Sequence, residues 1–391
     1  MRLGQDPELD DLRRRVRELC AEQGPKRSQK AGVRAPEASE IPALRKWTAE
    51  LYGRQLLGVT WPEECGGLPD PHPRHEAVVS EELAKAGAPM PVGGGLLAAS
   101  AIIDFGTEEQ KAFYLPRIRS GEHIWCQLFS EPGAGSDLAG LHTRARREGD
   151  HYIVDGQKVW TTNGHHADWG YLLARTDPDV PKHKGITAFA IDMKSPGVQV
   201  RPLREITGTA DFNEIFLDGV EVPVENVIGE ENKGWMVTTS SLARERSSAG
   251  GGVTLFRALD DLVDLVSSTT RDDERLIDRG EVRREVGRLA AAVHVNALLS
   301  AYGESRSVAG TSDAADAALS KIFFGEVNLA VAEYGMSVQA GDSVRVEGDP
   351  AALAGGWWQD AFLYARAFTI AGGTNEVLRN LVAERGLGLP R

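Results

Sequence analysis

Apolar residues recur at helical spacing through most of the first hundred residues. Residues 7–22 carry leucine and valine three or four positions apart, which predicts an amphipathic helix with Asp6 as N-cap and Pro7 in the first turn. Further helices are predicted over residues 41–57, 74–87, 94–104 and 107–119. Thr107 is the expected N-cap of the last one. The polar and basic residues 24–39 are expected to form a loop.

The pattern changes near Glu122, where short stretches rich in β-branched and aromatic residues alternate with turns. The predicted strands cover residues 125–129, 143–147, 152–159, 169–174, 185–191, 198–203 and 213–222. Clusters of Gly, Pro, Asp and Asn separate most of them. Short strands at this spacing suggest a small barrel or sandwich.

Helical spacing returns near Asn232 and continues to the last residues of the sequence. The predicted helices cover residues 234–247, 252–266, 281–302, 313–338, 357–368 and 374–384. A stripe of valine and leucine runs from Val282 to Leu298, and such stripes usually pack into a core. The charged residues 271–284 are expected to form a solvated connection. The predicted order of elements is therefore helical, then β, then helical.

Composition excludes several classes of protein. The formal net charge of -13 argues against nucleic acid and against an anionic membrane surface as partners. The 3 cysteines are far apart and show no CxxC spacing, which favours free thiols in a reducing compartment over disulfides or a zinc site. No signal peptide is visible, and no apolar run approaches the ~18–20 residues of a membrane span. We therefore expect a cytoplasmic enzyme.

One stretch, residues 126–140, combines an apolar strand with a glycine-rich loop. Its sequence is CQLFSEPGAGSDLAG, in which the loop follows directly after Phe129. Glycine is the default residue where a backbone approaches a ligand closely or takes a positive φ. Taken alone, the loop fits a tight turn in a β domain equally well, because a generic glycine-rich loop is a weak motif.

The stretch becomes specific through four accompanying motifs. These are WPEECGG at residues 61–67, GTEEQK at 106–111 followed by a Leu-Pro pair at 115–116, KVWTTNG at 158–164 and GTNEVLR at 373–379. This set, in this order, resembles the acyl-CoA dehydrogenase family from about Leu57 onward. The resemblance implies a mostly α fold with a central β-barrel. It divides the chain into an N-terminal helical domain (1–121), a β-barrel domain (122–231) and a C-terminal four-helix bundle (232–391).

The resemblance also implies FAD as the cofactor. Its predicted contacts are Phe129, Ser130, Gly135, Ser136, Trp160, Thr161, Thr162, Thr374 and Glu376. Phe129 and Ser130 would line the flavin ring, and Gly135 and Ser136 would approach the pyrophosphate, with Ser136 also near the CoA. Trp160 would cover one face of the ring. The alternatives are a core tryptophan at Trp160 and an ordinary turn hydroxyl at Ser136.

The reaction implied is α,β-dehydrogenation of an acyl-CoA thioester, which requires a carboxylate base. Many family members carry this base just before the Gly-Thr of the last motif, where this chain has Gly372. Isovaleryl- and long-chain-type members instead place it on a bundle helix immediately before an arginine. Glu245 and Arg246 match that arrangement, so we expect Glu245 to be the base and Arg246 to contact the substrate. The alternative is a pair of solvated charges on a helix surface.

Two departures from the family pattern concern contacts between subunits. The usual Arg-x-x-Phe-Gly keeps at best Arg271, and the usual Gln-x-x-Gly-Gly is reduced around Gln339. We therefore expect either a homo-oligomer or a heteromer in which a related subunit supplies the missing FAD contacts. An electron-transferring flavoprotein is the expected electron acceptor.

The remaining motifs add little chemistry. No GxGxxG follows a strand, and HExxH is absent. The adjacent His165 and His166 are expected to lie in a surface turn, with no metal. Three hypotheses remain: an acyl-CoA dehydrogenase of fatty acid or lipid β-oxidation, a non-catalytic or partner-dependent subunit, and a flavin oxidase or monooxygenase on the same fold. The acyl chain cannot be read from the sequence.

Overall fold

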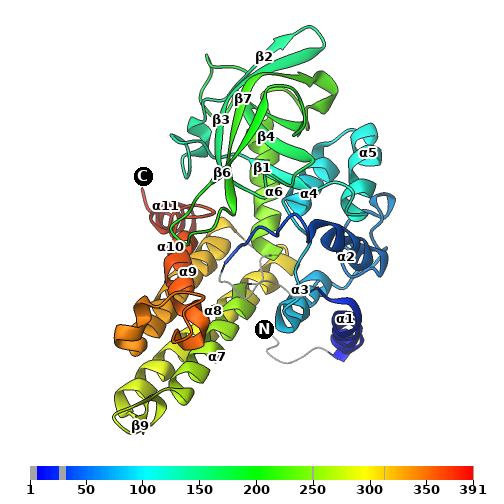
Figure 1. Ribbon diagram of the computed structural model, residues 1–391. Helices are drawn as coiled ribbons and strands as arrows, with labels where there is room; N and C mark the ends of the chain where they lie inside the picture. Colours follow the sequence, from blue (N-terminus) through cyan, green and yellow to red (C-terminus); the bar gives the residue numbers. More distant parts are fainter. Residues whose placement is uncertain (1–6, 26–31, 249–250, 312, 391) are drawn as a thin grey trace. The chain divides into compact units, whose positions relative to one another are not determined.

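The computed structural model describes residues 7–25, 32–248, 251–311 and 313–390, without the side chains of residues 243–248, 251–253, 308 and 314 (Figure 1). The predicted N-cap Asp6 lies outside the described residues. Backbone contacts divide the chain into two compact units. The sheet unit comprises Asp6–Lys26 and Ala35–Ser248, and the helical unit comprises Met1–Gln5, Arg27–Arg34 and Ala249–Arg391. The domain limits 1–121, 122–231 and 232–391 stay a prediction.

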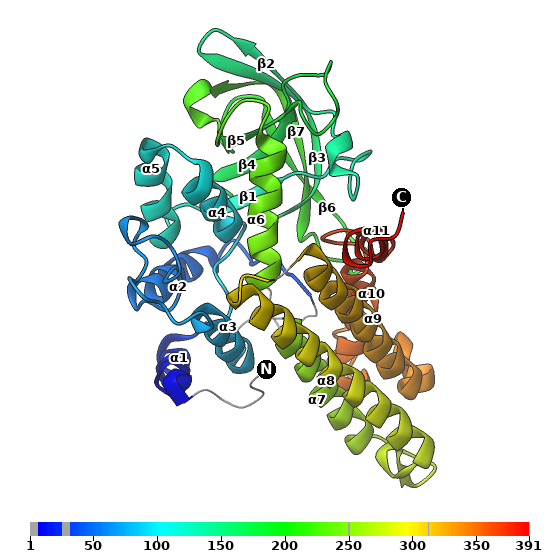
Figure 2. The same ribbon diagram turned by 180° about the vertical axis from the view of Figure 1, so that it is seen from behind.

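The helices of the sheet unit follow the predicted apolar spacing. They are α1 (Asp10–Gln23), α2 (Ile41–Gly53), α3 (His75–Ala86), α4 (Gly95–Phe105), α5 (Glu108–Arg119) and α6 (Gly234–Ser248). Thr107 caps α5 as predicted, since its side chain accepts from Gln110 N–H while the Gln110 side chain accepts from Thr107 N–H. In Figure 2, α6 stands against α4 and β5, which it contacts.

Seven strands form the sheet beside these helices. They are β1 (Trp125–Leu128), β2 (Arg144–Glu148), β3 (His151–Thr162), β4 (Trp169–Arg175), β5 (Ile186–Asp192), β6 (Val198–Leu203) and β7 (Phe212–Pro223). The order β1-β4-β2-β3-β7-β6 has β5 paired with β4, and β1 runs parallel to β4. Among the described residues no pairing joins β6 back to β1 or β5. The sheet is therefore open, and the expected closed barrel is not confirmed.

The helical unit is built around α9. Its helices are α7 (Gly251–Ser268), α8 (Gly280–Val308), α9 (Ala314–Gln339), α10 (Trp357–Phe368) and α11 (Asn375–Leu381). Helix α9 packs against the other four, and the core between them includes Leu262, Leu289, Val331 and Trp358. The predicted helical composition of this region is confirmed.

The charged connection after α7 contains a small hairpin that the sequence prediction missed. Strand β8 (Thr270–Arg271) pairs with β9 (Glu274–Arg275) through a two-residue turn. Asp272 and Asp273 both adopt positive φ, 54° and 60°, as the favoured type of tight hairpin turn requires. Residues 272–275 are exposed, as expected for a solvated connection, but they are ordered as a hairpin.

The cysteines are free thiols in different surroundings. Cys126 on β1 is 1% exposed, and its Sγ lies 3.8 Å from Sδ of Met193. Burial raises the pKa of the Cys126 thiol. Cys20 and Cys65 are only partly buried. Within the described residues, no helix combines the length and apolar content needed to cross a bilayer.

Candidate active site

The glycine-rich loop leaves β1 and turns back on itself at once. Glu131 and Ala134 exchange backbone hydrogen bonds of 2.9 and 3.1 Å. Phe129, 8% exposed, packs edge-on against Tyr171 with ring centroids 4.9 Å apart. Gly135 and Ser136 are exposed, and a Cβ atom built on Gly135 would meet nothing within 4 Å. The loop therefore exposes both residues predicted to approach the pyrophosphate and leaves space beside the Gly135 backbone.

Trp160 is held in a strained position at the end of β3. The pairing of β3 with β7 is irregular between Lys158 and Thr161, and Trp160 has a φ of 61°. A left-handed φ is rare for an aromatic residue and persists only where surrounding contacts enforce it, often at functional sites. Trp160 is 58% exposed, and its ring lies edge-on to Phe212 with ring centroids 5.9 Å apart. The alternative of a core tryptophan is wrong.

The residues after Trp160 carry unsatisfied polar groups. Thr161 is 1% exposed, and its Oγ1 has no hydrogen-bond partner among the described residues. The same holds for Oδ1 of Asn163, which is 5% exposed and has a φ of 57°. Thr162 is half-buried and pairs with Phe212 on β7. Buried polar atoms without partners are uncommon in native proteins, so this cluster has unused hydrogen-bonding capacity.

A buried ion pair joins the glycine-rich loop to β3. Lys158 Nζ donates to Glu131 Oε1 at 2.8 Å and to the Phe129 carbonyl at 3.1 Å. Val159 N–H donates to the Ser130 carbonyl at 2.9 Å. The structure therefore brings the predicted contacts in the loop next to those at the end of β3. Sequence reasoning assigned no role to Lys158, although a lysine beside apolar strand positions, with a glutamate in the facing loop motif, is a signal that could have found it.

The last two predicted cofactor contacts lie in the helical unit. Thr374 is the N-cap of α11, and its hydroxyl accepts from Val377 N–H at 3.3 Å. Glu376 is exposed, with a carboxylate oxygen 3.7 Å from Arg379. Lys321 on α9 donates to the Gly373 carbonyl at 2.7 Å and to Asn375 Oδ1 at 3.0 Å. Burial lowers the pKa of Lys321, although the charge of Glu376 acts in the opposite direction.

The predicted base lies on α6. The backbone of Glu245 and Arg246 is helical, but both side chains lie outside the described residues. The alternative position, Gly372, has a φ of 70° and is followed by Gly373 at 100°. Glycine adopts these conformations without the penalty that a side chain would add. The backbone at Gly372 thus favours glycine over a carboxylate residue.

Both residues matched to the family's contacts between subunits are engaged within their own chain. Arg271 in β8 donates to the Val338 carbonyl at 3.2 Å. Gln339 is 4% exposed, and its Nε2 donates to the Gly335 carbonyl at 2.8 Å. Each of the two side chains thus has a hydrogen-bond partner within the same chain.

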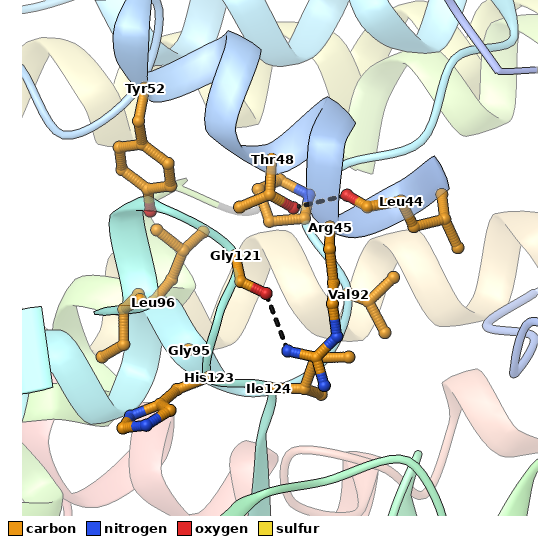
Figure 3. A pocket seen from close by; sticks show the side chains of 13 residues that line it. Leu44, Arg45, Thr48, Tyr52, Val92, Gly95, Leu96, Gly121, His123 and Ile124 are labelled. Carbon is orange, nitrogen blue, oxygen red and sulfur yellow. Dashed lines mark hydrogen bonds between the residues drawn. The ribbon is translucent and has the colours of Figure 1, made fainter. Parts of the chain in front are cut away.

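Two cavities among the described residues lie apart from the predicted FAD-contact residues, although Arg271 lines the second. The first, of about 20 Å³, lies between α2, α4 and α5, where Thr48 donates to the Leu44 carbonyl and Arg45 to the Gly121 carbonyl (Figure 3). This volume is enough for a water molecule and too small for a thioester. The second, of about 500 Å³, is lined by α7, β8 and α10 in the helical unit.

The histidine pair lies in a turn as predicted. His165 is within hydrogen-bond distance of Asn213, and His166 of the Pro36 carbonyl. Throughout the part of the chain that the structure describes, no group of three His, Cys, Asp or Glu residues is placed to hold a metal.

Sequence and structure comparisons agree on one family. Its N-terminal, middle and C-terminal domain models match residues 6–122, 126–220 and 232–387. The acyl-CoA dehydrogenase IpdE1 of Mycobacterium tuberculosis is 37% identical over 89% of this chain and 88% of its own length. The chain belongs to the acyl-CoA dehydrogenase family. Members of this family are FAD-dependent oxidoreductases, and the predicted resemblance is confirmed.

Two further relatives of this chain differ in how much of their own length it covers. The acyl-CoA dehydrogenase FadE34 of Mycobacterium tuberculosis is 40% identical over 92% of this chain, but the match spans only 49% of FadE34. The solved structure of the Tcur3481-Tcur3483 steroid acyl-CoA dehydrogenase is 30% identical, with a TM-score of 0.86 and full coverage of both chains. The chain thus spans about half the length of the first relative and the whole of the second.

Proposed function

We propose that the chain is an FAD-dependent dehydrogenase that converts an acyl-CoA thioester to its α,β-unsaturated product. The observation that carries this proposal is the exposed, strained Trp160 beside the open glycine-rich loop. A solvent-exposed indole held in a costly backbone conformation is suited to cover a planar ligand. The unpartnered Thr161 hydroxyl next to it supplies hydrogen-bonding capacity of the kind a flavin edge requires.

The residues present fit FAD. Phe129, Ser130 and the Trp160–Thr162 segment would hold the ring, and the exposed residues Gly135 and Ser136 would approach the pyrophosphate. Thr374 and Glu376, in the helical unit, stay predicted FAD contacts from the family resemblance. When bound, FAD supplies the acceptor for the hydride that leaves the β-carbon of the thioester.

Glu245 takes the α-proton in this proposal. The α-proton of a thioester is weakly acidic, so the site must exclude water and raise the pKa of this carboxylate toward neutrality. Hydrogen-bond donors aimed at the thioester carbonyl must also stabilise the developing enolate. Arg246, the next residue on α6, is the proposed substrate contact. The positive φ of Gly372 supports a base on α6 rather than at the C-terminal motif.

The proposed partners are a related subunit and an electron-transferring flavoprotein. The reduced Arg271 and Gln339 motifs, whose side chains bind carbonyls within the same chain, support a heteromer in which a related subunit supplies FAD contacts. The structural relative Tcur3481-Tcur3483 is a steroid acyl-CoA dehydrogenase, which supports a bulky, ring-bearing acyl-CoA as substrate here. A partner-dependent subunit without its own activity is the second candidate function.

The test is an anaerobic titration of the purified protein, alone and co-expressed with its partner, with linear, branched and ring-bearing acyl-CoA thioesters. Bleaching of the oxidised-flavin absorbance by one class establishes the reaction and the substrate. Glu245→Gln should retain flavin but slow its reduction by about 10²–10⁴-fold. Glu231→Gln, the same chemical change at an exposed residue just before α6, is the matched control and should reduce normally.

Three results would contradict the proposal or redirect it. Full turnover by Glu245→Gln would remove Glu245 from the mechanism. Flavin retained only after co-expression, with normal bleaching by the Glu245→Gln complex, would favour the partner-dependent subunit. Peroxide formed with substrate in air would favour a flavin oxidase.

A further inference from the structure

Lys158 is the most deeply buried cation among the described residues of the sheet unit, and the proposed chemistry does not use it. Its side chain is 0% exposed, and the side chain of its partner Glu131 is 5% exposed. A buried ion pair seldom adds net stability, because removing two charges from water costs about as much as their attraction returns. The pair therefore calls for an explanation beyond stability.

The contacts of the pair converge on the two ends of one loop. At the start, Lys158 holds the Phe129 carbonyl and the Glu131 carboxylate. At the end, the same carboxylate accepts from the backbone N–H groups of His142 at 2.6 Å and Thr143 at 2.9 Å. The ion pair thus closes residues 131–143 into a loop and fixes that loop to β3.

Lys158 also lies two residues before Trp160 on the same strand. The Lys158 side chain and the Val159 N–H both hold the loop, and the positive φ of Trp160 follows directly after them in β3. One ion pair consequently sets the separation between the loop and the exposed indole. These are the two protein surfaces between which the proposed cofactor site lies in this unit.

We infer that Lys158 and Glu131 are positioning residues, which hold the glycine-rich loop and Trp160 in register for FAD. This inference rests on the proposed function and deepens it. Neither side chain needs to touch the cofactor. Their effect passes through the backbone of Phe129, Ser130 and residues 131–143, so loss of the pair weakens cofactor binding by loosening the loop.

The charge state of the pair gives the inference a distinctive pH dependence. Glu131 is the titratable group that faces Lys158, and the other groups around the pair are the Phe129 carbonyl and the His142 and Thr143 N–H groups. Burial lowers the pKa of Lys158 to about 8, although Glu131 opposes the shift. Burial also acts to raise the pKa of Glu131, but Lys158 and the hydrogen bonds outweigh it and hold that pKa below its usual value. The pair is therefore charged at neutral pH and loses the lysine charge above about pH 8.

A rise in pH is expected to change FAD affinity and folding stability in opposite directions. Because the pKa of Lys158 is lower in the folded chain than the usual 10.5, the unfolded chain binds this proton more tightly. Raising the pH from about 8 toward 10.5 thus makes the contribution of Lys158 to stability more favourable. An alkaline fall in FAD affinity without a fall in stability would distinguish positioning from unfolding.

The experiment measures the FAD dissociation constant of wild type, Lys158→Met, Lys158→Arg and Glu131→Gln across pH of about 6.5–9.5, with thermal unfolding in parallel. Wild-type affinity should fall as pH rises through about 8. Lys158→Met and Glu131→Gln should bind FAD at least about tenfold more weakly than wild type. The affinity of Lys158→Met should not fall further as the pH rises. Lys158→Arg keeps its charge at alkaline pH, so it should retain part of the FAD affinity and should also show no fall in affinity as the pH rises.

Lys182→Met is the matched control, because Lys182 Nζ binds Asp137 of the same loop at 2.8 Å but lies 49% exposed. Its FAD affinity should stay within about twofold of wild type. Amide hydrogen exchange of residues 131–143 at one fixed pH provides a readout without cofactor. Lys158→Met should exchange faster there, most clearly at His142 and Thr143.

The outcomes separate the two proposals. A folded Lys158→Met variant with wild-type FAD affinity, or with unchanged exchange at residues 131–143, overturns the positioning role. A wild-type protein that binds no FAD, alone or with its partner, overturns the proposed function. In that case the exchange data still decide whether the pair orders the loop.

Discussion

The two glycine-containing loops of the predicted site are each held by a lysine, but in different ways. In the sheet unit, fully buried Lys158 binds a backbone carbonyl and a carboxylate. In the helical unit, half-buried Lys321 binds a backbone carbonyl and the neutral amide oxygen of Asn375. Since a cation removed from water needs a counter-charge, only the deeper lysine requires a glutamate. Burial depth thus accounts for the carboxylate that binds Lys158 directly, whereas the hydrogen-bond partners of Lys321 are neutral.

Lys158→Met should produce the largest loss of stability. It leaves the Glu131 carboxylate buried with only backbone donors, and breaking one side of a buried pair costs about 3–5 kcal/mol. Thermal and urea unfolding followed by circular dichroism would measure it. The double variant Lys158→Met/Glu131→Leu, which removes both charges, should be more stable than the single variant. A double variant that is no more stable than Lys158→Met would show that the charge of Glu131 is not the source of the cost.

Lys321→Met should cost less, about 1–2 kcal/mol, because the partners left behind are neutral and water can reach the partly exposed position. Hydrogen exchange should increase in α11 and in the Gly372–Gly373 turn more than in α9. Lys321→Arg is the conservative control. If Lys321→Met loses as much stability as Lys158→Met, burial depth does not explain the difference between the two lysines.

Thr374→Ala should have the smallest effect, about 1 kcal/mol, since it removes one N-cap hydrogen bond from a short helix. Thr374→Ser keeps the hydroxyl and should behave like wild type. Unfolding midpoints and exchange at Val377 N–H would measure both variants. If Thr374→Ala loses more stability than Lys321→Met, the N-cap contributes more than the lysine to holding the loop before α11.

The sequence predicted regular elements well where one local signal dominates. Thr107 as N-cap predicted the start of α5, and apolar spacing predicted α10 with the observed bounds. It predicted less well where tertiary pairing decides. The parallel pairing of β1 with β4 and the extension of β3 to Thr162 depend on neighbouring strands that are distant in sequence.

The candidate site shows the same division. The motifs identified the loop and the Trp160 segment, because family resemblance can be read residue by residue. They did not reveal that Trp160 is exposed and strained, since a tryptophan in a strand is usually buried. Nor did they reveal the Lys158–Glu131 pair, because lysine is rarely buried and its partner lies 27 residues earlier. The conformation at Gly372 also had to be observed.

The surroundings of Cys126 make this thiol a natural reporter for the sheet. Packed against Met193 and with a raised pKa, it should be inert to a thiol-labelling reagent while β1 stays paired. The partly buried Cys20 and Cys65 should react earlier. Mass spectrometry would then count two labels on the native chain and a third only after the strand that leads into the glycine-rich loop has opened. Labelling at increasing urea concentrations would show the concentration at which that strand opens, without any introduced probe.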